Sequence, residues 1–118
     1  MDQVSMHEAS IMESALESAF GELRRAGRRE IVRMKLRVGV LSGVVPDALA
    51  FAFESLKGST PAAGADLEIE LMPAVFVCLD CAAEAELTEM TFHCPRCEGC
   101  LVLDHGGHEL ELTQLELN

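Results

Sequence analysis

The sequence predicts an α+β fold, in which two helices pack on a three-stranded sheet and a small cysteine-bearing module is inserted between the second and third strands. Two segments repeat their apolar residues at helical spacing, and three others alternate apolar with polar residues. All cysteines lie between residues 78 and 100. The resulting order of elements lets both helices cover one face of a single sheet.

The first helix is expected to follow Ser5 and to stop at Gly27. Ser5 and Glu8 have the spacing of a capping box, in which both side chains satisfy free amide groups at the start of a helix. Gly27 follows two arginines and is a typical helix stop. The expected apolar face contains Met12, Leu16, Ala19, Phe20 and Leu23.

The first strand and the second helix follow in residues 31–58. Residues 31–40 alternate, so one set of side chains faces the core and a basic set faces solvent. The inward set is Val32, Met34, Leu36 and Val38, and the outward set is Arg33, Lys35 and Arg37. Pro46 suits the first turn of a helix, which should end near Lys57-Gly58.

Two further strands are expected at residues 67–71 and 109–117. Glu68 and Glu70 alternate with apolar residues, so pairing with the first strand would set them against its basic residues. The leucines of the last strand change parity between Leu112 and Leu115, which requires a bulge near Thr113-Gln114 or a bend. Residues 104–107 are expected as a turn, and the surroundings of the cysteines as loops.

The formal net charge of −11 excludes several classes of function. Residues 1–58 hold 8 basic and 8 acidic residues, whereas residues 59–118 hold 1 basic and 12 acidic residues. Binding to nucleic acid or to an anionic membrane surface requires a basic face, so neither is expected. The first 30 residues lack a basic start followed by an apolar core, which predicts a cytoplasmic protein.

The cysteines predict a metal site. Cys78 and Cys81 form one C-x-x-C pair, and Cys94 and Cys97 form a second. Two such pairs can build a tetrahedral cage of four thiolates, as in a zinc-ribbon-like module, and zinc is the first expectation. A rubredoxin-like iron centre is the main alternative. A closed cage leaves no open coordination position for a substrate, so no enzyme activity is expected.

Other side chains near this site have two interpretations each. Cys100 is either a free thiol or an alternative ligand, because it forms another C-x-x-C pair with Cys97. His93, His105 and His108 are either solvated or close enough to tune the metal.

His7 and Glu8 are a second candidate site, at the start of the chain. Glu8 fits the capping box, and His7 fits an exposed first turn. Met6 is also an alternative translation start, and a chain that began there would offer an amine, an amide nitrogen and an imidazole. Such a nitrogen-rich set suits Ni(II) or Cu(II).

These motifs together resemble the HypA/HybF family of nickel-incorporation proteins for [NiFe]-hydrogenase maturation. The resemblance runs from residue 6 to residue 117. It rests on Met6-His7-Glu8, on the runs at residues 38–44, 49–54, 57–59 and 65–69, on the two C-x-x-C pairs, and on the runs at residues 107–112 and 115–117. It implies a nickel metallochaperone, with Ni²⁺ as cargo at His7 and Glu8 and structural Zn²⁺ at Cys78, Cys81, Cys94 and Cys97.

The resemblance also implies a domain organisation and a set of partners. The nickel-binding α+β domain would comprise residues 1–75 and 107–118, and the zinc-binding domain residues 76–106. A HypB-type GTPase and the hydrogenase large subunit are the implied partners, with urease accessory proteins and a homodimer as further candidates. The competing interpretation is a zinc-ribbon protein-interaction module without a nickel role.

Overall fold

The computed structural model describes residues 6–88 and 93–118, and its elements follow the predicted order. The first half contains helix α1 (Met6–Ala26), strand β1 (Ile31–Gly39), helix α2 (Pro46–Leu56) and strand β2 (Asp66–Met72). The second half contains strands β3 (Ala74–Cys78), β4 (Glu84–Leu87), β5 (Leu101–Gly106) and β6 (Leu110–Leu117). The predicted cap, Ser5, lies outside the described residues.

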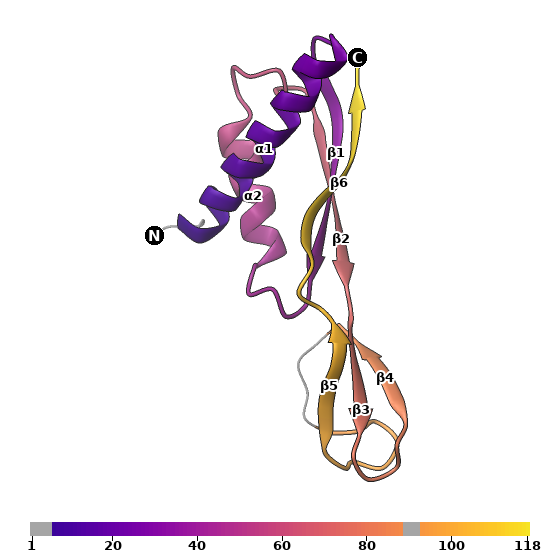
Figure 1. The fold of residues 1–118 in the computed structure, drawn as a ribbon. Coiled ribbons are helices and arrows are strands. Elements are labelled where there is room, and N and C mark those ends of the chain that lie inside the picture. Colours follow the sequence, from indigo (N-terminus) through magenta and orange to yellow (C-terminus); the bar gives the residue numbers. More distant parts are fainter. Residues whose placement is uncertain (1–5, 89–92) are drawn as a thin grey trace.

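One sheet has the strand order β2-β1-β6, and both helices lie on the same side of it (Figure 1). Strand β1 pairs with β2 in parallel and with β6 in antiparallel orientation. Two parallel neighbours need a crossover connection, and α2 provides it. The predicted layer of two helices on three strands is therefore confirmed. We call this layer the helical half.

The main core lies between the helices and this sheet. Met12, Met34 and Phe53 are completely buried there, while Phe20 is only partly buried. The expected inward position of Val32 is wrong, because the register shifts between Ile31 and Arg33 and turns Ile31 into the core instead. A bulge of this kind changes the face on which a side chain lies. Within the described residues, neither helix is long and apolar enough to span a bilayer.

The outer face of the sheet carries the predicted ion pairs. Lys35 Nζ lies 3.7 Å from Glu68 Oε2, and Arg37 Nε donates a hydrogen bond of 3.1 Å to Glu70 Oε1. The hydrogen bond from Arg37 lowers the pKa of Glu70. This carboxylate therefore stays ionised to lower pH than an unpaired glutamate would.

The bulge expected in the last strand is also present. Lys35 pairs with Gln114 and Leu36 pairs with Leu112, so Thr113 is the extra residue. The Thr113 hydroxyl donates a hydrogen bond of 3.3 Å to the Lys35 carbonyl. The bulge brings the leucines before and after it onto the same face of the sheet.

A second sheet, with strand order β4-β3-β5, continues beyond the end of the first (Figure 1), and its middle strand β3 ends at Cys78. We call residues 74–106 the cysteine module. The expectation of loops around the cysteines is wrong, because β3, β4 and β5 occupy much of this segment. The expected turn at residues 104–107 is also wrong, since β5 continues to Gly106. The turn-forming residues at the end of β5 are in a strand because they pair with the apolar strand β3. A register shift between Val75 and Phe76 leaves Asp104 as an extra residue in β5.

The two sheets join end to end and give an elongated molecule of 55 × 36 × 16 Å. Two chain segments connect them, one through Pro73 and one through Gly106-Gly107. Gly39 at the end of β1 contacts the second segment: its amide donates to the Glu109 carbonyl at 2.7 Å. A Cβ atom on Gly39 would lie 2.1 Å from the Gly107 carbonyl oxygen, so only glycine fits there without displacing backbone.

Candidate metal centre

Four cysteine sulfurs gather at the tip of the cysteine module. The Sγ atoms of Cys78, Cys81, Cys94 and Cys97 all lie within 4.8 Å of one another. The Cys78–Cys97 distance is 3.5 Å and the Cys81–Cys94 distance is 3.8 Å. Thiolates about 2.3 Å from a tetrahedral Zn²⁺ lie about 3.8 Å apart, so this cluster fits a structural zinc site. The distances far exceed the roughly 2.05 Å of a disulfide bond.

Both C-x-x-C pairs have the same backbone conformation. The amides of Asp80 and Cys81 point at Cys78 Sγ, at 3.3 and 3.4 Å, and the amide of Arg96 points at Cys94 Sγ at 3.4 Å. The turns close through amide-to-carbonyl bonds from residue 82 to residue 78 and from residue 98 to residue 94. Amide donors stabilise the thiolate form of a cysteine, which is the form that binds a metal.

Each turn ends on a residue with a left-handed backbone. Ala82 and Glu98 both have φ of 63°, four residues after the first cysteine of their pair. This conformation costs a side-chain-bearing residue about 1–2 kcal/mol relative to a right-handed one. Sequence reasoning missed both positions, because neither is the glycine that usually marks such a turn.

Replacing Glu98 with glycine is expected to stabilise the zinc-loaded cysteine module by about 0.5–1 kcal/mol, because glycine adopts this φ without a steric penalty. The measurement is the thermal unfolding midpoint of the module. Glu98→Ala is the matched control, since it removes the carboxylate but keeps the Cβ atom. Equal midpoints for the two variants would show that the backbone of residue 98 stores no strain.

The Asp80 side chain links the first C-x-x-C turn to the residues that follow the second C-x-x-C turn. Its Oδ2 atom accepts a hydrogen bond of 3.1 Å from the Cys100 amide, and the Leu79 amide donates to the Cys100 carbonyl at 2.9 Å. A Cβ atom on Gly99 would lie 2.2 Å from Asp80 Oδ2, so glycine there permits the close approach. Sequence reasoning missed this role of Asp80, because nothing in the local pattern reveals a bond across 20 residues.

The electrostatics of the sulfurs favour a bound cation. Hydrogen bonds from the amides of Arg96 and Cys97 lower the pKa of Cys94 to about 7. The Gly99 amide lowers the pKa of Cys97. The neighbouring Cys78 and Cys81 sulfurs and burial raise it by more, so that the pKa of Cys97 is about 12. Without a metal, four adjacent sulfurs therefore share protons, because several negative charges in one place repel one another. A divalent cation removes this repulsion.

Cys100 and the nearby histidines lie outside this group of four. The Cys100 side chain is exposed, and its Sγ atom lies 3.8 Å from the Leu101 carbonyl oxygen. His93 forms an isolated backbone bridge with Cys100. His105 Nδ1 lies 2.7 Å from Asp104 Oδ2, in an exposed pair on β5.

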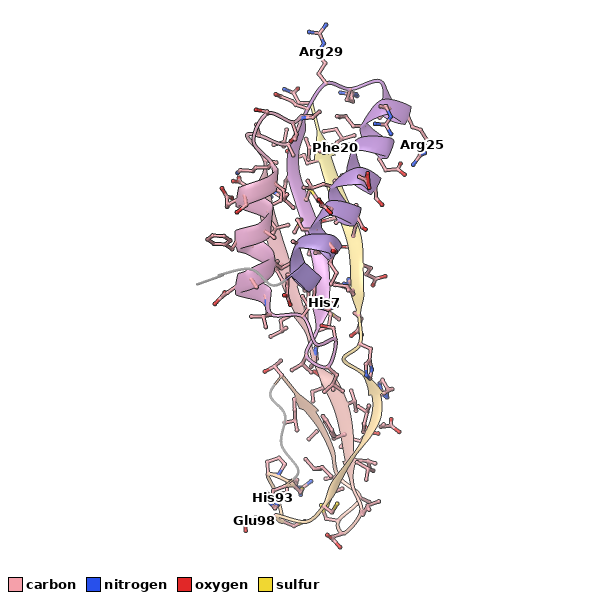
Figure 2. The ribbon with its side chains drawn as sticks, turned by 90° about the vertical axis from the view of Figure 1, so that its left-hand side faces the viewer. His7, Phe20, Arg25, Arg29, His93 and Glu98 are labelled. Atoms are coloured by element: carbon pink, nitrogen blue, oxygen red, sulfur yellow. The ribbon has the colours of Figure 1, made fainter. Side chains whose placement is uncertain are left out.

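His7 and Glu8 lie at the first turn of α1, far from the sulfurs (Figure 2). His7 Nδ1 is 3.8 Å from Glu8 Oε2; the His7 side chain is 60% exposed and that of Glu8 only 4%. The Glu8 carboxylate accepts a hydrogen bond of 3.1 Å from the Val45 amide, at the start of α2. This long-range contact fixes the carboxylate beside His7, and the capping-box pattern gave no sign of it.

Comparison with known proteins finds one family along nearly the whole chain. A family model described as "Hydrogenase/urease nickel incorporation, metallochaperone, hypA" matches residues 6–117. The hydrogenase maturation factor HypA of Chloroflexus aurantiacus is 46% identical over 113 residues, covering 94% of this chain and 98% of the relative. The HypA of Geotalea uraniireducens is 41% identical over 112 residues, covering 95% and 99%.

The fold has solved counterparts. The solution structure of the Ni metallochaperone HypA from Helicobacter pylori aligns with a TM-score of 0.62 at 21% identity, over 93% of this chain and 96% of that one. A second solution structure, of a HypA protein, aligns with a TM-score of 0.59 at 20% identity. At this identity the likeness concerns the fold, and it includes both the helical half and the cysteine module.

Proposed function

Because this chain belongs to the HypA family of hydrogenase and urease nickel-incorporation metallochaperones, we propose that it binds Ni²⁺ at the start of α1 and delivers it to a maturing [NiFe]-hydrogenase. The family match, which begins at residue 6 and so includes His7 and Glu8, is the observation that carries the proposal. Nickel is cargo in this role. The role requires no catalytic cycle, and we propose that the protein is not an enzyme.

The geometry at His7 supports a metal-binding role. Two ligand atoms that are each about 2.1 Å from one ion lie between about 3 and 4.2 Å apart. The 3.8 Å between His7 Nδ1 and Glu8 Oε2 lies between these limits, so the exposed ring would move by under about 1 Å to reach the spacing of two adjacent ligands. The Val45 amide holds the Glu8 carboxylate in place beside the imidazole ring. Imidazole is a good Ni²⁺ ligand, and the exposed ring lets an ion enter and leave.

The second metal serves structure in this proposal. We assign Cys78, Cys81, Cys94 and Cys97 as the zinc ligands, and zinc, when bound, supplies the cross-link between the two turns. The sheet of the cysteine module supports a division into a nickel-binding domain of residues 1–75 and 107–118 and a zinc-binding domain of residues 76–106. A second core, which contains buried residues from Ala74 to Leu101, supports treating the cysteine module as a separate domain.

Titration of Ni²⁺ into the zinc-loaded protein, followed by calorimetry, tests the nickel site. His7→Ala is expected to weaken binding at least about tenfold, because it removes the only imidazole at this corner of the described residues. His105→Ala is the matched control, since His105 is also exposed and also lies beside a carboxylate. Equal affinities for wild type and His7→Ala would contradict the proposed site.

The same titration on a chain that starts at Met6 measures the part played by a free amine. Tighter binding than for the chain that starts at Met1 is expected, because an amine and an amide nitrogen would join the imidazole as ligands of the ion.

A pull-down from a nickel-replete extract with wild type and His7→Ala separates the nickel role from a pure interaction module. We propose a HypB-type GTPase, the hydrogenase large subunit and urease accessory proteins as partners, in the cytoplasm, and a homodimer as the candidate assembly.

A further inference from the structure

Strand β6 carries a row of leucines that the helices cover only in part. Leu110, Leu112, Leu115 and Leu117 lie opposite the buried β1 residues Val38, Leu36, Met34 and Ile31, so the bulge at Thr113 keeps the whole row on the helix side. Leu110 is nevertheless 41% exposed, whereas its neighbour Val38 is completely buried. The helices therefore cover β1 fully and leave β6 half covered.

A groove follows this row between β6 and α1. Its two parts, of about 400 and about 540 Å³, meet at Ser18 and Leu112. On the α1 wall, Ile11 and Ala15 lie next to three exposed serines spaced one turn apart, Ser10, Ser14 and Ser18. Helix positions that face an apolar strand usually carry large apolar residues. Serines at these positions leave space above the leucine row that side chains from elsewhere can fill.

The opposite face of the same sheet is arranged in columns of alternating charge. The column on β2 is acidic (Glu68, Glu70), that on β1 is basic (Arg33, Lys35, Arg37), and that on β6 is acidic (Glu111, Glu116). Ion pairs join neighbouring columns, as between Lys35 and Glu68 at 3.7 Å and between Arg33 and Glu116 at 4.0 Å. Among the strands described here, β6 is an edge and pairs with β1 alone.

We propose that β6 accepts an extended segment of a partner protein as a fourth strand of this sheet. The segment alternates apolar and basic residues: its apolar side chains fill the groove beside α1, and its lysines or arginines continue the charge pattern beyond Glu111 and Glu116. Backbone bonds to the free edge supply affinity, as in other cases of strand addition. The bulge at Thr113 divides this edge, so pairing forms in two short runs on either side of it.

The charges select against a second copy of the chain at this edge. Two β6 strands side by side would place one acidic column against another, and like charges opposite each other destabilise a strand pair. The leucine row alone would invite self-association, since a long edge strand with an apolar face is prone to it. The acidic column directs this edge to a basic partner. This inference does not depend on nickel binding at His7.

Two synthetic ten-residue peptides of the same composition, five leucines and five lysines, test the proposal. One alternates the two residues strictly, and the other places leucines at helical spacing. In an NMR titration of the zinc-loaded full chain, the alternating peptide is expected to bind about tenfold more tightly and to shift resonances of β6 and of the α1 serine face. Equal or tighter binding of the helical peptide would overturn the assignment of an added strand.

Matched variants separate this edge from the general acidity of the chain. Glu111→Lys with Glu116→Lys is expected to weaken the alternating peptide about tenfold, because two favourable cross-strand positions become repulsive. Glu84→Lys with Glu86→Lys changes the net charge equally on β4 and is expected to stay within about twofold of wild type. Equal losses for both double variants would show attraction by net charge alone and would refute the proposal.

A third variant tests the groove itself. Ser14→Leu fills the space above the leucine row and is expected to weaken the peptide about tenfold, while circular dichroism shows an unchanged fold. Ser55→Leu, on the exposed side of α2, is the control. Unchanged binding to Ser14→Leu would rule out the groove as the binding surface. Sedimentation of the protein alone adds a further check, since a dimer that is lost in Ser14→Leu but kept in Ser55→Leu would assign the edge to a second copy.

Discussion

Replacing Cys94 with serine is expected to release the zinc and to unfold the cysteine module, while the helical half keeps its structure. Cys94 is 2% exposed and belongs to a small core, which contains five buried residues among those that the structure describes. A core of this size cannot offset the entropy of ordering the module by itself. Structural zinc contributes about 10 kcal/mol or more of binding free energy, and most of it is lost with one ligand.

Elemental analysis and hydrogen exchange measure the two parts of this result. Zinc content should fall well below one equivalent, and amides of β3, β4 and β5 should lose protection while those of α1 and β1 keep it. Cys100→Ser is the matched control, because Cys100 lies outside the group of four sulfurs. A full equivalent of zinc in the Cys94 variant would contradict the ligand assignment.

Gly39→Ala is expected to destabilise the protein by about 2–3 kcal/mol, because the new methyl group has no space between two backbone segments. The added Cβ atom would lie 2.1 Å from the Gly107 carbonyl oxygen and 2.6 Å from the Glu109 nitrogen. Relief requires β1 and the returning chain to move apart, which breaks the Gly39–Glu109 and Leu41–Gly107 backbone bonds. Chemical denaturation of the zinc-loaded protein measures the loss.

Gly64→Ala provides the comparison for this variant. No atom lies within 4 Å of the added Cβ at Gly64, so little change in stability is expected there. A Gly39 variant as stable as the Gly64 variant would show that the junction adapts without cost. Hydrogen exchange at Leu41 adds a local measurement, because its amide is bonded across the junction at 2.6 Å.

Periodicity predicted the elements of the helical half because each has one buried and one solvated face. The parity change in the last strand predicted a bulge near Thr113-Gln114 or a bend, because strict alternation would place the two pairs of leucines on opposite faces, and the structure has the bulge at Thr113. The alternating charges of β1 and β2 likewise predicted their contacts. In the first strand the same argument failed by one residue, because apolar residues stand at both Ile31 and Val32 and a bulge decides between them.

Spacing predicted the four sulfurs of the metal centre, but not what positions them. The bond from Asp80 to the Cys100 amide and the bond from the Val45 amide to Glu8 join distant parts of the chain. Such contacts depend on tertiary structure, and local patterns do not encode them. The cysteine module also contains more strand than expected, because turn-forming residues such as Asp104 and Gly106 lie in a strand that β3 completes.

The double connection between the two sheets restricts how the molecule can flex. Pro73 and the Gly106-Gly107 segment form a ribbon two chains wide, which resists bending in its own plane far more than across its thickness. Motion of the cysteine module therefore has one soft direction, perpendicular to the ribbon, and the molecule is 16 Å across in its thinnest dimension. Movement in this direction strains the Gly39–Glu109 and Leu41–Gly107 backbone bonds, which cross the junction between the two halves.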